Sequence, residues 1–174
     1  MLCFVSGGSA SGKSALAERI CAALPAERHI YIATMPVHGP EDERKVARHH
    51  ALRAGRGFET LEMPNRLYPV PPDAAVLLEC LSTFTANRMF SGETPPACGW
   101  LDGLWAELQP LLSRPGPTVI VSAEVGADGM AYDPYTEDYR RTLTGLGVRF
   151  CARSDCAVEA VCGRMRVHKG ALPF

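Results

Sequence analysis

An eight-residue segment near the start of the chain, Gly7–Ser14, reads GGSASGKS and fits the pattern G-x-x-x-x-G-K-S/T in full. The glycines of this pattern let the backbone turn tightly and direct amide N–H groups at a phosphate, where a β-carbon would block the approach. Lys13 is expected to reach the β- and γ-phosphates of a nucleotide, and the Ser14 hydroxyl to bind Mg²⁺. The segment therefore predicts a phosphate-binding loop between a strand and a helix.

The sequence on either side of the loop meets this requirement. Leu2–Val5 is a short apolar strand, and from Gly12 to Ala23 apolar residues recur at helical spacing. The alternative is a chance match in a glycine-rich turn, which would not require a strand before the segment and a helix after it. We predict that the loop as a whole binds phosphate through Gly7, Gly8, Ser9, Ala10, Ser11, Gly12, Lys13 and Ser14.

The rest of the chain alternates between strand and helix patterns. Further strands are expected at His29–Thr34, Phe58–Glu62, Ala74–Glu79 and Pro117–Glu124, with Ala157–Cys162 as the last. Helices are expected at Glu41–Arg53, around Thr83–Phe90, at Trp100–Leu112 and at about Tyr135–Arg153. Such alternation predicts an α/β fold with a mostly parallel sheet flanked by helices. With 174 residues, the chain is expected to form one domain, 1–174.

Charge and composition exclude several classes of protein. The net charge of −1 argues against a protein that coats nucleic acid, which needs a basic face. No apolar run is long enough to span a membrane, and the N-terminus does not resemble an export signal, so a cytoplasmic protein is expected. The seven cysteines form no C-x-x-C pair and are expected to be reduced, mostly buried thiols.

Two carboxylates end predicted strands at the edge where α/β sheets place their ligands. Glu79 follows five apolar residues and is predicted to be the carboxylate partner of Ser14 for the metal. Glu124 ends its strand in the same manner, and a structural role there is equally consistent with the sequence.

His49 and His50 lie on a basic stretch with Arg44, Lys45, Arg48 and Arg53. They can be incidental residues on a solvated helix face. Alternatively, the neighbouring cations lower the pKa of an imidazole, which keeps it neutral and nucleophilic, and hold a polyphosphate beside it. A neutral histidine can attack phosphorus and form a covalent intermediate. Spacing alone does not decide between these readings.

The motifs together resemble one enzyme family over nearly the whole chain. These motifs are GGSASGKS, YIAT at 31–34, ARHHALRAGRGFETLE at 47–62, LLECLSTFTAN at 77–87 and EVGADGMAYDP at 124–134. In this order and spacing they are similar to the adenosylcobinamide kinase/adenosylcobinamide-phosphate guanylyltransferase family. The resemblance implies a RecA-like P-loop NTPase fold and a homotrimer with its active site near a subunit interface.

The resemblance also implies two reactions with small-molecule substrates. The first phosphorylates adenosylcobinamide with ATP or GTP, and the second transfers GMP from GTP to adenosylcobinamide phosphate. By analogy His49 is the guanylylated residue, and Lys13 is the other catalytic residue. Besides the loop, the implied nucleotide contacts are Thr34, Met35, His50, Ala51, Leu52, Arg53, Glu62 and Glu79, with Ser14 and Glu79 on the metal.

The sequence departs from the family pattern at two positions. Ala123 stands where the family usually has an amide side chain, and Gly147 where it commonly has asparagine. Both lie outside the loop and the histidine block, so they affect cobinamide handling or subunit contacts more than nucleotide chemistry. Two alternatives remain open: a simple P-loop small-molecule kinase without a covalent step, and a non-catalytic nucleotide-binding regulator.

Overall fold

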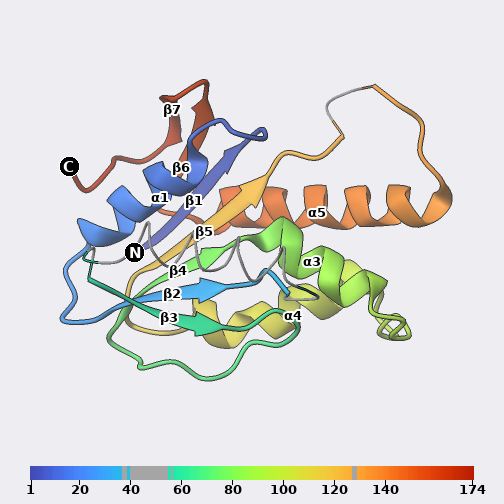
Figure 1. Ribbon diagram of the computed structural model, residues 1–174, viewed down its shortest axis with the longest axis horizontal. Helices are drawn as coiled ribbons and strands as arrows, with labels where there is room; N and C mark the ends of the chain where they lie inside the picture. The colour runs from blue at the N-terminus through green and yellow to red at the C-terminus, as the bar shows by residue number, and fades with distance from the viewer. Residues whose placement is uncertain (37–38, 40–54, 56, 127–128) are drawn as a thin grey trace.

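A computed structural model describes residues 1–36, 39, 55, 57–126 and 129–174 (Figure 1). Among these residues, no helix is long and apolar enough to cross a membrane. The strands are β1 (Leu2–Gly7), β2 (His29–Ala33), β3 (Phe58–Glu62), β4 (Ala75–Glu79), β5 (Thr118–Ala123), β6 (Cys156–Val161) and β7 (Arg164–Lys169). The helices are α1 (Lys13–Ala22), α3 (Leu81–Phe90), α4 (Trp100–Leu112) and α5 (Pro134–Arg153).

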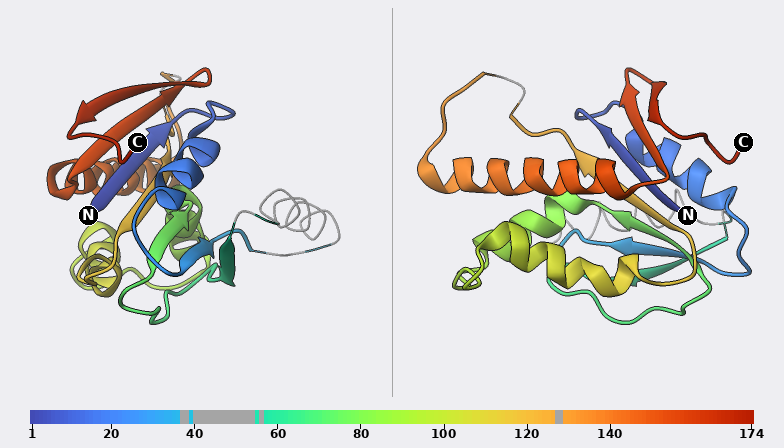
Figure 2. Two further views of the ribbon diagram at one scale, coloured as in Figure 1. Left: turned by 90° about the vertical axis from the view of Figure 1, so that its left-hand side faces the viewer. Right: turned by 180° about the vertical axis from the view of Figure 1, so that it is seen from behind.

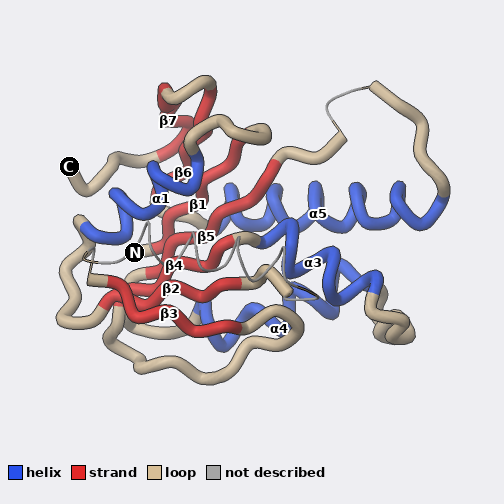
Figure 3. The backbone as a smooth tube through the Cα atoms, in the orientation of Figure 1, coloured by secondary structure: helices blue, strands red, loops and turns tan. Residues whose placement is uncertain are grey.

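The strands form one sheet in the order β3-β2-β4-β5-β1-β6-β7. The first six are parallel, and only β7 pairs antiparallel, with β6. The tube in Figure 3 shows this sheet running through the middle of the molecule with helices on both sides. The expected α/β architecture with a mostly parallel sheet is therefore confirmed.

Each face of the sheet has its own apolar core because side chains alternate along the strands. On one face, α1 packs through Leu16, Ala17 and Ile20 against β1, β4 and β5. On the other, α3, α4 and α5 cover the sheet, with Phe84, Leu108 and other fully buried residues between them. The side view in Figure 2 shows the sheet between these two layers.

Most of the predicted elements agree with the structure to within two residues, and one strand was missed. The chain was expected to end its sheet at Ala157–Cys162, which is wrong because Arg164–Lys169 adds the edge strand β7. All six residues of β7 are exposed, so it has no buried face from which to recognise a strand. The helix predicted at Glu41–Arg53 lies outside the described residues.

The cysteines are all free thiols in the structure. Cys3, Cys21 and Cys156 are buried, and burial raises the pKa of Cys3 and Cys21 to about 12, so both stay protonated at neutral pH. Cys98, Cys151 and Cys162 are exposed, contrary to the expectation that most of the thiols are buried.

Candidate active site

The phosphate-binding loop connects the C-terminal end of β1 to the first turn of α1. Ala10 and Gly12 have positive φ angles of 55° and 92°, and the N–H of Ser11 donates to the carbonyl oxygen of Gly8 at 3.3 Å. No side chain caps α1 at Gly12, and its first turn contains no acidic residue. The first amide N–H groups of the helix are therefore available to an anion, and the helix dipole favours it there.

Gly7 is required at the base of the loop because two neighbours approach its backbone closely. A β-carbon at this position would lie 2.6 Å from the carbonyl oxygen of Ala160 and 2.6 Å from Oγ of Ser11. A backbone oxygen of a paired strand cannot move aside as a flexible side chain can. Any larger residue at position 7 would therefore displace the loop from β6.

Ser14 and Glu79 meet across the sheet edge, as the sequence predicts. The Ser14 hydroxyl donates to Oε1 of Glu79 at 2.5 Å, although the two residues are 65 positions apart. A hydroxyl and a carboxylate oxygen are the hard ligands that Mg²⁺ takes when phosphates and water complete its shell. Among the described residues no cluster of three or more His, Cys, Asp or Glu could hold a metal. A serine hydroxyl and one carboxylate fit an ion whose other ligands are phosphate oxygens and water.

Thr34 fixes the backbone at the end of β4, where Glu79 emerges. Its buried Oγ1 accepts a hydrogen bond from the N–H of Cys80 at 2.7 Å and lies 3.0 Å from the carbonyl oxygens of both Glu79 and Cys80. The N–H of Thr34 donates to the Glu79 carbonyl at 3.0 Å. The position of the Glu79 backbone thus depends on Thr34.

Asn87 continues this network, a role that the sequence reading did not assign to it. Its side-chain amide donates to the carbonyl oxygen of Thr34 at 2.8 Å and to that of Pro64 at 2.7 Å. In the sequence, the signal for this role is an amide side chain within the apolar helix α3. However, its partners lie 53 and 23 positions away, so the pattern does not name them.

Two more of the predicted contacts, Met35 and Glu62, and the open candidate Glu124 lie at the carboxyl ends of strands. Met35 follows β2, Glu62 ends β3 and is exposed, and Glu124 follows β5 and is exposed, with its N–H donating to the carbonyl oxygen of Gly7 at 3.1 Å. The carboxyl ends of parallel strands lie at one edge of the sheet, so these residues share the edge that carries the loop, with Glu62 four strands from β1. The predicted residues His49, His50, Ala51, Leu52 and Arg53 lie outside the described part of the chain.

The structure also places Ala123 and Gly147, the two positions at which the sequence departs from the family pattern. Ala123 ends β5 opposite Gly7 of β1. Gly147 lies in α5, where an added β-carbon would contact Phe4 at an ordinary 3.9 Å. Elsewhere in α5 the hydroxyl of Tyr139 donates to the carbonyl oxygen of Ser82, and burial raises the pKa of Tyr139 to about 12.

Comparison with known structures shows the fold. An ATPase of the type III secretion system of pathogenic bacteria superimposes with a TM-score of 0.50 at 16% identity, covering 91% of this chain and 50% of that chain. The chain thus spans about half the length of this ATPase. Together with the loop and the sheet order, this likeness places the chain among P-loop NTPases with a RecA-like fold.

Comparison with known sequences shows the family. The family described as "Cobinamide kinase / cobinamide phosphate guanyltransferase" matches residues 3–167. The bifunctional adenosylcobalamin biosynthesis protein CobU of Salmonella typhimurium is 28% identical over 170 residues, 89% of this chain and 92% of that protein. The corresponding CobP of Pseudomonas aeruginosa is 33% identical over 127 residues, 70% of each chain. The chain therefore belongs to the cobinamide kinase / cobinamide phosphate guanyltransferase family, and it is a nucleotide-binding enzyme of cobalamin biosynthesis with kinase and guanylyltransferase activities.

Proposed function

We propose that this chain phosphorylates the hydroxyl of adenosylcobinamide and then transfers GMP to the new phosphate through a GMP-histidine intermediate on His49. One domain, residues 1–174, carries both reactions. The observation that supports this most is the contact between Ser14 and Glu79, because it completes a metal-binding pair beside a full phosphate loop. The ARHH block at 47–50 stands in the same sequence, and the family matches across it.

In the kinase reaction the loop amides and Lys13 hold the nucleotide phosphates. Ser14 and Glu79 would hold Mg²⁺, which would supply positive charge to the nucleotide phosphates. Lys13 adds its own charge to the γ-phosphoryl group as the substrate hydroxyl attacks and the bond to the leaving diphosphate breaks. Catalysis of this type depends almost entirely on positioning and charge neutralisation. The donor is ATP or GTP, since the loop binds phosphate rather than base.

In the transferase reaction the neutral imidazole of His49 attacks the α-phosphorus of GTP. A nitrogen–phosphorus bond forms, the bond to the bridging oxygen breaks, and pyrophosphate leaves with the electron pair. An oxygen of adenosylcobinamide phosphate then attacks the same phosphorus and releases His49. Thr34, Met35, His50, Ala51, Leu52, Arg53, Glu62 and Glu79 are proposed to hold the guanine nucleotide. Glu62 and Glu79 end the strands β3 and β4, and Thr34 and Met35 directly follow the strand β2 between them, which supports this.

The covalent step is tested by incubating the protein with GTP and Mg²⁺ and measuring the mass of the intact chain. We expect an increase by one GMP on His49, labile in acid because a phosphorus–nitrogen bond to imidazole hydrolyses there. His49→Ala should abolish the adduct. His50→Ala is the matched comparison. His50 is a proposed nucleotide contact and not the nucleophile, so this variant should bind GTP more weakly but still form the adduct on His49.

A folded protein that binds GTP and forms no adduct would contradict the transferase half. If phosphate transfer to adenosylcobinamide then continues in His49→Ala at the rate of the wild type, the chain is a simple kinase. An adduct on His50 instead of His49 would correct the assignment of the nucleophile.

A further inference from the structure

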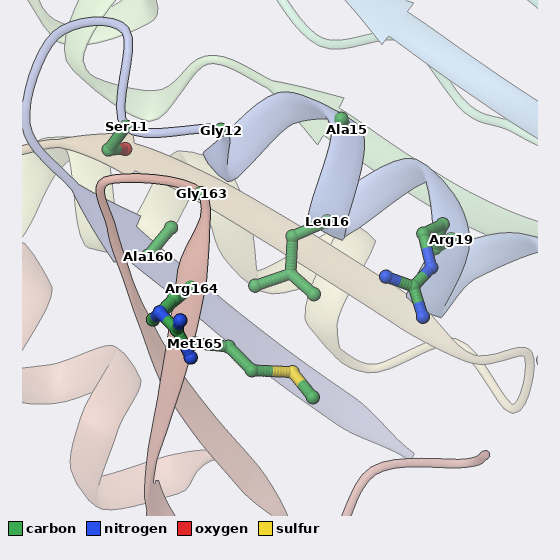
Figure 4. A pocket seen from close by; sticks show the side chains of 9 residues that line it. All are labelled: Ser11, Gly12, Ala15, Leu16, Arg19, Ala160, Gly163, Arg164 and Met165. Atoms are coloured by element: carbon green, nitrogen blue, oxygen red, sulfur yellow. The ribbon is translucent and has the colours of Figure 1, made fainter.

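A cavity of about 500 Å³ opens beside the phosphate loop, on the side away from Glu79. Its walls are the loop residues Ser11 and Gly12, Leu16 and Arg19 of α1, and Arg164 and Met165 of β7. Figure 4 shows the side chains of Leu16 and Met165 extending into the space between α1 and the hairpin of β6 and β7. Its volume is within the range of about 300–1,000 Å³ that is typical of small-molecule sites.

The sheet order separates this cavity from the contacts proposed for GTP in the transferase reaction. β1, which leads into the loop, has β6 and β7 on one side and β5, β4, β2 and β3 on the other. Thr34, Glu62 and Glu79 belong to the second side, whereas the cavity lies on the first. One phosphate loop is thus flanked by two different surfaces.

The walls suit a flat aromatic ring rather than a base that is read by hydrogen bonds. Leu16 and Met165 provide apolar and thioether contact, and Arg19 and Arg164 provide guanidinium planes that stack on π-systems. No Asp, Glu, Asn or Gln is found among the described residues that line the cavity. Arg19 already lies over an aromatic ring, that of Phe174, at 4.8 Å from its centre.

A hydrogen bond holds the hairpin of β6 and β7 against the phosphate loop, so the cavity is formed without a ligand. The N–H of Gly163 donates to the carbonyl oxygen of Ser11 at 2.9 Å, and an added β-carbon on Gly12 would touch Gly163 at 3.5 Å. Ser11 is 7% exposed, and its Oγ has no hydrogen-bond partner in the structure. A buried hydroxyl without a partner is costly, and a polar group of a ligand at this end of the cavity would satisfy it.

We propose that this cavity binds the nucleoside of the phosphoryl donor in the kinase reaction, with the base stacked between Met165, Leu16 and the two arginines. The proposal rests on the proposed kinase function. With the nucleoside on this side of the loop, the triphosphate runs along the loop toward Ser14 and Glu79. The γ-phosphoryl group then lies at the metal pair and faces the substrate. Because the base is held by stacking, ATP and GTP both serve as donors.

The test compares two double variants on the same exposed strand. Arg164→Ala with Met165→Ala removes the proposed stacking side chains. Arg166→Ala with Val167→Ala is the matched control, since both of its residues are exposed on β7 and neither lines the cavity. We expect the first variant to weaken ADP binding about tenfold, as loss of stacking on a base does. Its KM for ATP should rise with kcat unchanged, and the control should match the wild type.

Two further measurements separate the cavity from the loop and from the fold. Binding of inorganic tripolyphosphate should be the same in all three proteins, because the loop is intact. In the wild type, light-activated 8-azido-ATP should label the segment 160–169 and be displaced by ATP. Formation of the GMP adduct from GTP should be unchanged in both variants, since that nucleotide is proposed to lie on the other side.

Equal ADP affinity in all three proteins, or labelling at residues 34–35 instead of the hairpin, would overturn this site while leaving the kinase function in place. Absence of ADP and ATP binding by the wild type would overturn it as well. If the wild type transfers no phosphate to adenosylcobinamide, the proposed kinase function fails. The binding and labelling results still decide whether the cavity holds a nucleoside.

Discussion

Thr34 shows how a single hydroxyl determines where a distant carboxylate lies. The residue is fully buried, and its side chain bonds to the backbone around Glu79 and Cys80, 45 and 46 positions further along the chain. Glu79 in turn contacts Ser14 of the phosphate loop. The loop, β2 and the end of β4 are therefore connected through two side-chain hydroxyls and one carboxylate.

We predict that Thr34→Val destabilises the fold and displaces Glu79. Valine keeps the volume but leaves the buried N–H of Cys80 without an acceptor, at a cost of about 1–3 kcal/mol in the free energy of unfolding. Thr34→Ser keeps the hydroxyl and serves as the control. Urea unfolding measures the stability of both variants. Equal stability of the valine and serine variants would show that the hydroxyl contributes nothing.

The sequence predicts the loop and Glu79 but not the residues that fix their positions. Gly7–Ser14 is recognisable because all its chemistry is local, and Glu79 because it ends an apolar run. Thr34 and Asn87 act on backbone groups many positions away, and no local pattern encodes such a contact. The hydrogen bond between Ser11 and Gly163 joins residues even further apart, and no local pattern predicts it either.

At the scale of elements, β7 was missed because it lacks the signal on which strand prediction depends. Its sequence RMRVHK is exposed throughout, and its stability comes from backbone pairing with β6. A signal does exist in the turn before it. Cys162 and Gly163 have φ angles of 48° and 76°, and two positive φ angles in a two-residue turn are typical of a tight hairpin. In the sequence only Gly163 points to such a turn, because cysteine is not among the residues that usually precede glycine there.

We predict that Asp133, the N-cap residue of α5, makes the free energy of unfolding depend on pH in the acidic range. Hydrogen bonds from the Thr136 hydroxyl and from the N–H groups of Thr136 and Tyr135 lower the pKa of Asp133 below its ordinary value of 3.8. The stabilisation is complete above pH 3.8 and is lost as the pH falls through the lower pKa of the folded state.

Thermal unfolding of the wild type, Asp133→Ala and Asp133→Asn from pH 7 to about pH 2 checks this prediction. The wild type should unfold at a higher temperature than the alanine variant at pH 7, and the difference should narrow below pH 3.8. The asparagine variant can accept the two backbone hydrogen bonds through its Oδ1 without titrating, although its amide nitrogen cannot accept from the Thr136 hydroxyl. Its advantage over alanine should therefore not change with pH. A constant difference between wild type and alanine would contradict the assignment.

At the scale of the whole molecule, we predict that three copies of the chain assemble. The family resemblance implies a trimer whose active sites lie near subunit interfaces. Light scattering should then give a mass three times that of the 18.8 kDa chain. Activity per chain should fall on dilution, in parallel with the loss of trimer, because each site would lose a neighbouring surface. A mass of one chain with full activity at all dilutions would exclude the trimer as the active form.

The central position of β1 has a consequence for the order in which the protein can form. β1 is synthesised first, yet its two neighbours in the sheet are Thr118–Ala123 and Cys156–Val161. During translation β1 has no neighbouring strand until β5 has been synthesised, when about two thirds of the 174 residues have been made. The hairpin of β6 and β7, which supports the phosphate loop, follows later still. The phosphate loop thus gains its hydrogen bond from Gly163 only after β6 and the turn that follows it have been synthesised, long after the loop itself.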